Sequence, residues 1–154
     1  YYQYRNLGSQ LVTTAGSMGY AVPAAIAAKL VYPKKTVVSF NGDGCFMMLG
    51  QEIINAIEND LNPIFIIINN EKLGTIRMHQ ERKFPKRVVG TSIKNPDFVA
   101  LANAYGLNAM RITDTEDFYE NFERAKNNKK ATLIELIIDP NVLTPSIEIG
   151  KNIG

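Results

Sequence analysis

Hydrophobic positions in this chain alternate between short continuous runs and stretches with helical spacing. Residues 64–68 are apolar at every position, and residues 132–138 are nearly so. A strand that is apolar on both faces is typical of a parallel sheet covered on both sides. Weaker runs predict two more strands, at 36–40 and 107–112, and a short fifth strand at 10–13.

Helical patterns lie between these runs. One helix has an apolar residue at every fourth position and a proline that suits its first turn, Pro23. Apolar residues at 46, 49, 53 and 57 share the face of a second helix. Asn95 followed by Pro96 predicts the N-cap and first turn of a third, which Gly106 ends. A fourth helix opens at 114 or 115.

Strands that alternate with helices predict βαβ units and a mainly parallel, doubly wound sheet. We therefore expect an α/β fold, a three-layer α/β/α sandwich formed by residues 1–154 as one domain. Ligands of such sheets bind beyond the carboxyl ends of the strands. The residues that follow each predicted strand are therefore the first candidates for a functional site.

Composition narrows the function classes. With 45% hydrophobic and 21% charged residues, the chain resembles an average globular domain rather than a disordered one. A net charge of +2 predicts no nucleic-acid partner, and no apolar run approaches the roughly 18 residues of a membrane span. A single cysteine, Cys45, cannot form an internal disulfide and favours a reducing, cytoplasmic location. The first residue is not Met, so we expect a piece of a longer polypeptide.

Two predicted strand ends carry residues that could bind a metal and a phosphate. Gly42-Asp43-Gly44 follows the first strand; the carboxylate is a hard ligand, and the glycines allow a sharp turn and a close backbone approach. Asn69-Asn70 follows the second, and Asn70 could offer a neutral oxygen to the same cation. Free N–H groups at the helix start would attract a phosphate bridged by Mg²⁺ or Ca²⁺. Either motif alone is also common in ordinary turns.

The spacing of the two motifs resembles a known signature. Gly42-Asp43-Gly44, 24 intervening residues and Asn69-Asn70 are similar to the motif of thiamine-diphosphate-dependent enzymes. Residues 16–28, 50–52, 95–98 and 104–106 also resemble the cofactor-binding domain of the acetolactate synthase family. The likeness runs from about residue 8 to residue 140. It implies the C-terminal, thiamine-diphosphate-binding domain of a multidomain enzyme.

The resemblance implies roles for individual residues. Asp43, Asn70 and the backbone carbonyl of Lys72 match the ligands of Mg²⁺. The Gly16 carbonyl matches the acceptor for the cofactor's amino group, and Met18 matches the residue that bends the cofactor into a V shape. Met18 could instead be ordinary core. The full set of implied cofactor-binding residues is Gly16, Met18, Gly42, Gly44, Cys45 and Ile76.

The resemblance also implies an activity that this chain cannot perform alone. An acetolactate synthase-like enzyme decarboxylates a 2-oxo acid and transfers the resulting acyl unit. The alternatives are a 2-oxo-acid decarboxylase subunit and a non-catalytic binding or regulatory module. The activating glutamate of the family lies on a pyrimidine-side partner domain, so we assign no catalytic residue here and expect the isolated domain to be inactive.

Several expectations concern the substrate side and the surroundings of the domain. Arg77 could hold a substrate carboxylate or be a surface cation, and His79 could be an acid/base or structural. Residues 77–89 lack periodicity, so we expect a mobile surface segment. An exposed face left by the absent partner domain predicts a homo-oligomer, most simply a two-fold dimer. The family's sheet has a further strand upstream of residues 1–5, and extending the chain to include it should raise the melting temperature.

Overall fold

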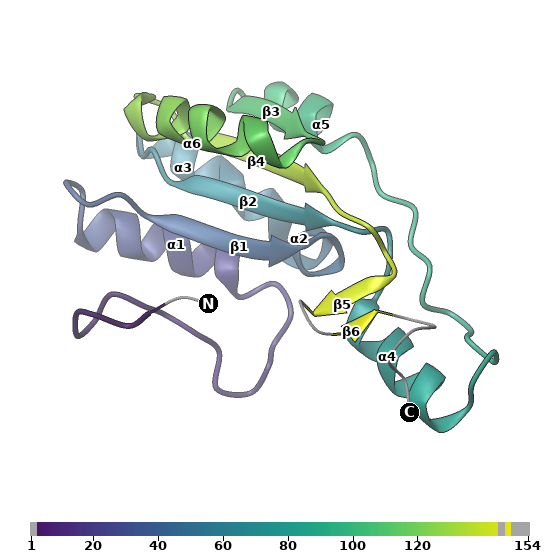
Figure 1. Ribbon diagram of the computed structural model, residues 1–154. Helices are drawn as coiled ribbons and strands as arrows, with labels where there is room; N and C mark the ends of the chain where they lie inside the picture. Colours follow the sequence, from purple (N-terminus) through teal and green to yellow (C-terminus); the bar gives the residue numbers. More distant parts are fainter. Residues whose placement is uncertain (1–2, 145–146, 149–154) are drawn as a thin grey trace.

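A four-stranded parallel sheet organises the domain. The computed structural model describes residues 3–144 and 147–148. The strands lie in the order β1 (Val38–Gly42), β2 (Ile64–Asn69), β4 (Thr132–Ile137) and β3 (Asn108–Ile112), as Figure 1 shows. All three pairings are parallel, so every strand ends at the same edge of the sheet.

Helices cover both faces of the sheet. One face packs against α1 (Ala21–Val31), α2 (Asp43–Leu49), α3 (Ile53–Glu58) and α5 (Phe98–Ala104). Its core contains Phe65, Ile67 and Leu133. The other face carries Ile64, Ile66 and Ile134 under α6 (Phe118–Asn127). The predicted three-layer α/β/α sandwich is therefore confirmed.

Three local predictions differ from the structure. Residues 10–13 form no strand, and Leu11 and Val12 are exposed. The strand predicted at 36–40 lies two residues later. The helix predicted across 46–57 is interrupted by a 3-10 turn at Gly50–Glu52. Gly50 is tightly packed at this break, because a Cβ there would lie 2.6 Å from the Phe46 ring.

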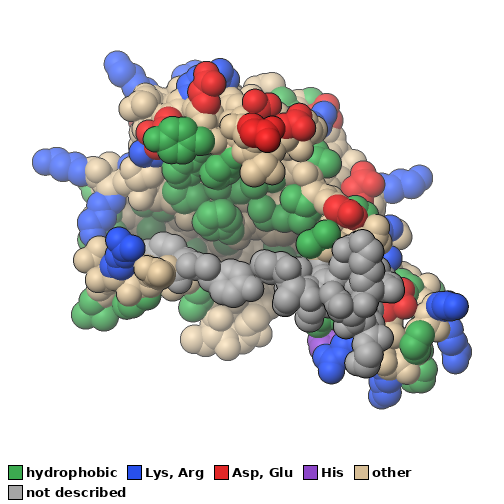
Figure 2. Space-filling model, in the orientation of Figure 1, with side chains coloured by type: hydrophobic (Ala, Val, Ile, Leu, Met, Phe, Trp, Pro, Cys, Tyr) green, Lys and Arg blue, Asp and Glu red, His purple; other side chains and the backbone are tan. Residues whose placement is uncertain are grey.

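The two edge strands of the sheet differ in how far helices cover their side chains. β3 forms one edge, as predicted for residues 107–112. β1 forms the other, and its Phe40 side chain is 66% exposed on the α6 face. Figure 2 shows hydrophobic side chains gathered over the middle of this face. Unlike β2, the edge strand β1 therefore keeps an uncovered apolar position.

A smaller part of the chain projects beyond the carboxyl edge. It contains α4 (Gly74–Lys83) and the hairpin β5 (Val142–Thr144) with β6 (Ile147–Glu148) (Figure 1). No residue of α4 is buried. The absence of periodicity predicted an irregular segment from residue 77, but the helix continues to Lys83; the mobility of this segment stays a prediction. No helix among the described residues is long and apolar enough to cross a membrane.

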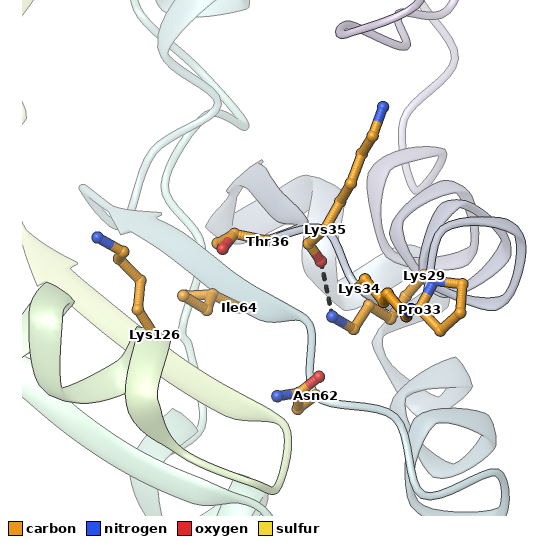
Figure 3. A pocket seen from close by; sticks show the side chains of 8 residues that line it. All are labelled: Lys29, Pro33, Lys34, Lys35, Thr36, Asn62, Ile64 and Lys126. Carbon is orange, nitrogen blue, oxygen red and sulfur yellow. Dashed lines mark hydrogen bonds between the residues drawn. The ribbon is translucent and has the colours of Figure 1, made fainter.

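Lysines gather at the opposite, amino end of the sheet. A hollow of about 180 Å³ is lined by Lys29, Pro33, Lys34, Lys35, Thr36, Asn62, Ile64 and Lys126 (Figure 3). The Lys29 ammonium donates to the Lys35 carbonyl at 2.7 Å. Burial lowers the pKa of Lys29. The Lys126 ammonium pairs with Glu123 at 2.7 Å.

Candidate functional site

Asp43 lies where β1 ends and α2 begins, and it is 2% exposed. Its Oδ1 accepts a hydrogen bond from the Gly44 N–H at 2.8 Å. Its Oδ2 accepts from the Glu71 N–H and from the Asn95 amide, both at 2.8 Å. A carboxylate offers about four lone-pair sites. The described residues use two on Oδ2 and one on Oδ1, so Asp43 keeps one site, on Oδ1, for a further partner.

The turn after β2 approaches Asp43 as the parallel register predicts. Glu71 has a φ of 52°, in the left-handed region that a non-glycine residue seldom adopts. Its N–H donates to Asp43 and also to Asn69 Oδ1 at 3.2 Å. Gly42 and Ile68 are register partners on the two strands. The two strand-end motifs therefore meet at one edge.

Asn70 and Lys72 present oxygens on one side of this turn. The Asn70 Oδ1 accepts from the Lys72 N–H at 3.0 Å, which leaves it a second lone pair. Lys72 opposes Ser92 in an antiparallel bridge whose hydrogen bonds come from the flanking residues, Leu73 and Ile93. In such a pair the N–H and C=O of Lys72 point away from Ser92. Both therefore face the side of the Asn70 amide.

Gly44 is closely packed by side chains, and its backbone angles lie outside the left-handed region. A Cβ there would lie 2.9 Å from Leu73 Cδ2 and 3.5 Å from Met18 Cε. By contrast, a Cβ on Gly42 would make only an ordinary contact, 3.8 Å from Cys45 Sγ. The Gly44 N–H already donates to Asp43, so its predicted contact with a diphosphate stays a prediction. Cys45, half-buried, follows in the same turn.

The two predicted residues upstream of α1 differ in surroundings. Met18 is 40% exposed and lies beside Gly44, so it is not core. Gly16 has a φ of 66°, and a Cβ added to it would have no atom within 4 Å. The structure thus brings Met18 to the strand ends and leaves Gly16 on an exposed loop.

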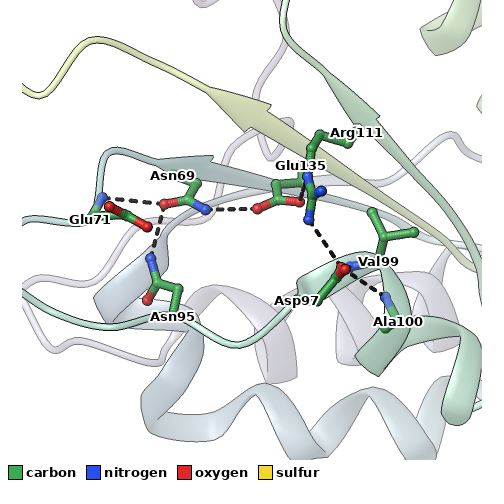
Figure 4. A network of polar contacts seen from close by, with 8 residues as sticks. All are labelled: Asn69, Glu71, Asn95, Asp97, Val99, Ala100, Arg111 and Glu135. Carbon is green, nitrogen blue, oxygen red and sulfur yellow. Dashed lines mark hydrogen bonds and ion pairs between the residues drawn. The ribbon is translucent and has the colours of Figure 1, made fainter.

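A polar network continues from Asp43 across the sheet. The Asn95 amide donates to Asn69 Oδ1 at 2.9 Å, and the Asn69 amide donates to Glu135 at 2.7 Å. The Arg111 guanidinium pairs with the other Glu135 oxygen at 2.7 Å and with Asp97 at 3.0 Å. Figure 4 shows these side chains arriving from β2, β3, β4 and the loop before α5.

The network lies on the α5 face, as strand periodicity requires. Leu133 is in the core of that face, and Glu135, two residues on, points the same way. Glu135 is 1% exposed and is the register partner of Arg111. Sequence reasoning missed Glu135 as a site residue. The available signal was one charged residue inside the apolar run 132–138.

The N-cap predicted at Asn95 is wrong. Asp97 caps α5 instead, because its Oδ1 accepts from the N–H groups of Val99 and Ala100. The Ala100 hydrogen bond is the main cause that lowers the pKa of Asp97, and Arg111 adds to it. Hydrogen bonding to Glu135 is the main cause that raises the pKa of Arg111. Asn95 is thus released from capping and contacts Asp43.

The predicted substrate-side residues lie on α4. Arg77 donates to the Pro140 carbonyl and to Asn141 Oδ1, both at 3.2 Å. It lines an open hollow of about 320 Å³ with Lys72, Glu81, Val88, Thr91, Ser92, Pro140 and Asn141. His79 and Ile76 are exposed on the same helix. Arg77 is therefore held by two neutral oxygens in the hollow that Lys72 also lines, and its role stays a prediction.

The donor set at the strand ends suits a hard cation. It consists of one carboxylate oxygen, one amide oxygen and one backbone carbonyl, from Asp43, Asn70 and Lys72. Three oxygen donors of low total charge are typical of Mg²⁺, which also keeps waters and binds phosphates. Among the described residues, no group of three or more His, Cys, Asp or Glu could hold a metal instead.

Comparison with known proteins identifies the family. Residues 1–136 match the thiamine pyrophosphate enzyme, C-terminal TPP binding domain. The chain is 36% identical over 132 residues to the mitochondrial acetolactate synthase of Schizosaccharomyces pombe, covering 84% of this chain and 20% of that protein. It is 34% identical over 136 residues to a probable acetolactate synthase large subunit of Methanocaldococcus jannaschii, covering 88% and 23%.

A third relative, the acetolactate synthase large subunit of Corynebacterium glutamicum, is 34% identical over 144 residues, covering 89% of this chain and 23% of that protein. The chain therefore belongs to the thiamine pyrophosphate enzymes, as their C-terminal cofactor-binding domain, and the predicted family is confirmed. It spans about a fifth of the length of the curated relatives that it matches.

Proposed function

We propose that this member of the thiamine pyrophosphate enzymes holds the diphosphate of thiamine diphosphate through Mg²⁺. The metal ligands would be Asp43, Asn70 and the carbonyl of Lys72. One observation carries the proposal: Asp43 keeps an available lone pair on Oδ1 and is hydrogen-bonded to the turn in which Asn70 Oδ1 also keeps one. The family match of residues 1–136 supports the cofactor.

We further propose that the complete enzyme decarboxylates a 2-oxo acid and transfers the acyl unit, as an acetolactate synthase does. When bound, the cofactor supplies an electron sink for decarboxylation. The chain's own residues orient and position it. Asp43 and Asn70 would hold the diphosphate end, and half-exposed Met18 offers an apolar contact beside Gly44 for the rings.

Arg77 is the best candidate for contact with the substrate carboxylate. Its guanidinium is held by two neutral oxygens, from Pro140 and Asn141, which position the charge without neutralising it. The hollow that it lines with Lys72 adjoins the proposed metal ligand. The two cations outnumber the one carboxylate among the described residues of this hollow, Glu81, so the hollow suits a 2-oxo acid whether the enzyme is a synthase or a decarboxylase.

Catalysis requires partners outside this chain. We propose that a pyrimidine-side domain completes the cofactor pocket and that the enzyme is a homo-oligomer. Exposed apolar residues at the site end support this, including Met18 at 40%, Met47 at 51% and Met48 at 54% exposure. Apolar side chains of this kind are typical of surfaces that a partner covers.

The test uses the full-length protein. Thiamine diphosphate binding is measured by calorimetry with Mg²⁺ and with a chelator, and products are then analysed with pyruvate, glyoxylate and aromatic 2-oxo acids. We expect binding only with the divalent cation and an acetolactate-type product from pyruvate. A simple aldehyde product would favour the decarboxylase alternative. Cofactor binding of equal affinity in chelator would contradict the metal assignment.

A further inference from the structure

We propose that Asn95 is a positioning residue that makes Asp43 a ligand through one oxygen only. The inference rests on the proposed Mg²⁺ site and extends it to side chains that do not touch the metal. Asn95 donates to Asp43 Oδ2 at 2.8 Å, and Glu71 donates to the same oxygen at 2.8 Å. These two donors occupy both lone pairs of Oδ2, so a cation reaches Asp43 through Oδ1 alone.

The orientation of the Asn95 amide is set by Glu135. An ionised carboxylate only accepts hydrogen bonds, so Asn69 must turn its NH₂ group toward Glu135. Asn69 Oδ1 then faces the other way, where it accepts from Glu71 and from Asn95. Asn95 consequently presents its NH₂ group to two oxygens, one on Asn69 and one on Asp43.

This orientation leaves one buried oxygen of Asn95 without a partner among the described residues. Both N–H bonds of its amide are engaged, and the oxygen in question is Oδ1. A buried acceptor without a partner is unfavourable. Rotating the amide by half a turn would be worse, because its oxygen would then face the Asp43 carboxylate and Asn69 Oδ1.

Arg111 anchors the far end of this chain of hydrogen bonds. Its guanidinium pairs with Glu135 at 2.7 Å, and Glu135 is 1% exposed. The same carboxylate therefore accepts from Arg111 through one oxygen and from Asn69 through the other. The Arg111–Glu135 pair on β3 and β4 therefore sets which atoms donate and which accept along the network, as far as the proposed metal ligand at the end of β1.

A monodentate carboxylate favours a small cation. Mg²⁺ demands near-octahedral geometry, whereas Ca²⁺ accepts bidentate carboxylates and variable geometry. Removing the Asn95 amide frees a lone pair on Oδ2 and lets the carboxylate rotate. The loss should therefore weaken Mg²⁺ binding more than Ca²⁺ binding.

The experiment measures metal preference in the full-length protein. Thiamine diphosphate binding is titrated by calorimetry with Mg²⁺ and separately with Ca²⁺, in the parent and in Asn95→Ala. Partners of metal ligands typically contribute 10–100-fold to affinity, so we expect the Mg²⁺ constant to weaken by about tenfold or more and the Ca²⁺ constant by clearly less. The matched control is Asn62→Ala, which removes an amide bonded to the Asn128 carbonyl at the other end of the sheet.

Glu135→Gln is the second variant. A glutamine can offer either its oxygen or its NH₂ group, so it no longer dictates the orientation of Asn69 and Asn95. We expect the same change of metal preference with a smaller amplitude. This variant keeps the proposal testable if Asn95→Ala does not fold, which thermal melts without cofactor would reveal.

Two results would overturn the proposal. One is an unchanged Mg²⁺ constant in either folded variant. The other is an equal loss for both cations, which would indicate a general structural effect. Failure of the proposed function looks different, because the parent protein itself would then bind the cofactor equally well in chelator.

Discussion

The two ends of the sheet both gather charged and polar side chains, but they build different structures. At the carboxyl end, one continuous network joins Asp43, Asn95, Asn69, Glu135, Arg111 and Asp97. Figure 4 shows all of these side chains except Asp43. At the amino end, four lysines surround a hollow with separate contacts (Figure 3). Only the first cluster joins several strands.

Sequence separation distinguishes the carboxyl-end network from the lysine contacts of the amino end, where a long-range side-chain bond in the hollow runs from Asn62 to the Asn128 carbonyl. Asn95 and Asp43 are 52 positions apart, and Asn69 and Glu135 are 66 apart. The lysine contacts are local, at six positions for Lys29 with Lys35 and three for Lys126 with Glu123. Long-range polar contacts form only if the whole sheet places them, whereas local ones form on any polar surface. A cluster of charge is therefore a weaker sign of a site than a network that spans the fold.

The largest effect is expected at the metal ligand of the carboxyl end. Asp43→Ala removes the only carboxylate of the proposed donor set, so metal-dependent binding of thiamine diphosphate should be abolished in the full-length protein. Calorimetry with Mg²⁺ measures this. Asp114→Ala, at an exposed position before α6, is the control and should bind as the parent does. Normal cofactor binding by Asp43→Ala would remove Asp43 from the site.

The next effect concerns the charge pair inside the network. Arg111→Ala leaves the Glu135 carboxylate 1% exposed and without its cation. Hydrogen bonds to charged groups contribute about 1.5–3 kcal/mol, and the Arg111 side chain is 42% exposed, so we expect a loss of about 2 kcal/mol. Denaturant unfolding of the full-length protein gives the value. Adding Glu135→Gln to Arg111→Ala should recover part of the lost free energy of unfolding. A loss below about 0.5 kcal/mol for Arg111→Ala alone would show that water replaces the guanidinium.

A smaller effect depends on pH. The pKa of Asp97 is lowered in the folded state, first by the Ala100 N–H, so its charge stabilises the fold above its ordinary pKa of 3.8. That contribution is lost as pH falls through the folded-state pKa. Asp97→Asn should therefore have a lower melting temperature than the parent at pH 7. The difference between the two melting temperatures should become smaller as pH drops below about 4. A difference in melting temperature that stays constant from pH 7 to below about pH 4 would contradict this explanation.

The smallest effect is expected at the lysine hollow. Lys34 is exposed at the amino end of the sheet, where its side chain can be solvated freely. Lys34→Ala should change the free energy of unfolding by no more than about 0.5 kcal/mol. It should also leave cofactor binding unchanged. If Lys34→Ala lowered the free energy of unfolding as much as Arg111→Ala does, side chains at the two ends of the sheet would contribute equally to stability.

Predictions about the fold succeeded where burial dominates local preference. The runs 64–68 and 132–138 became the two central strands because both of their faces are covered, so nearly every position must be apolar. The weak run 10–13 failed, because no neighbouring strand pairs with it within the described residues. Apolar pattern alone cannot supply a pairing partner.

The sequence by itself determined the order of the four sheet strands and of the helices that pack on them, the family resemblance and the meeting of Asp43 with the turn after β2. It could do so because parallel strands joined by a crossover must end at the same edge. Only the tertiary structure decided which polar side chains meet there. Asn95 looked like a helix cap and Glu135 like an isolated charge in a strand. Their hydrogen bonds cross between segments that are distant in sequence, and that distance closes only when the sheet has formed.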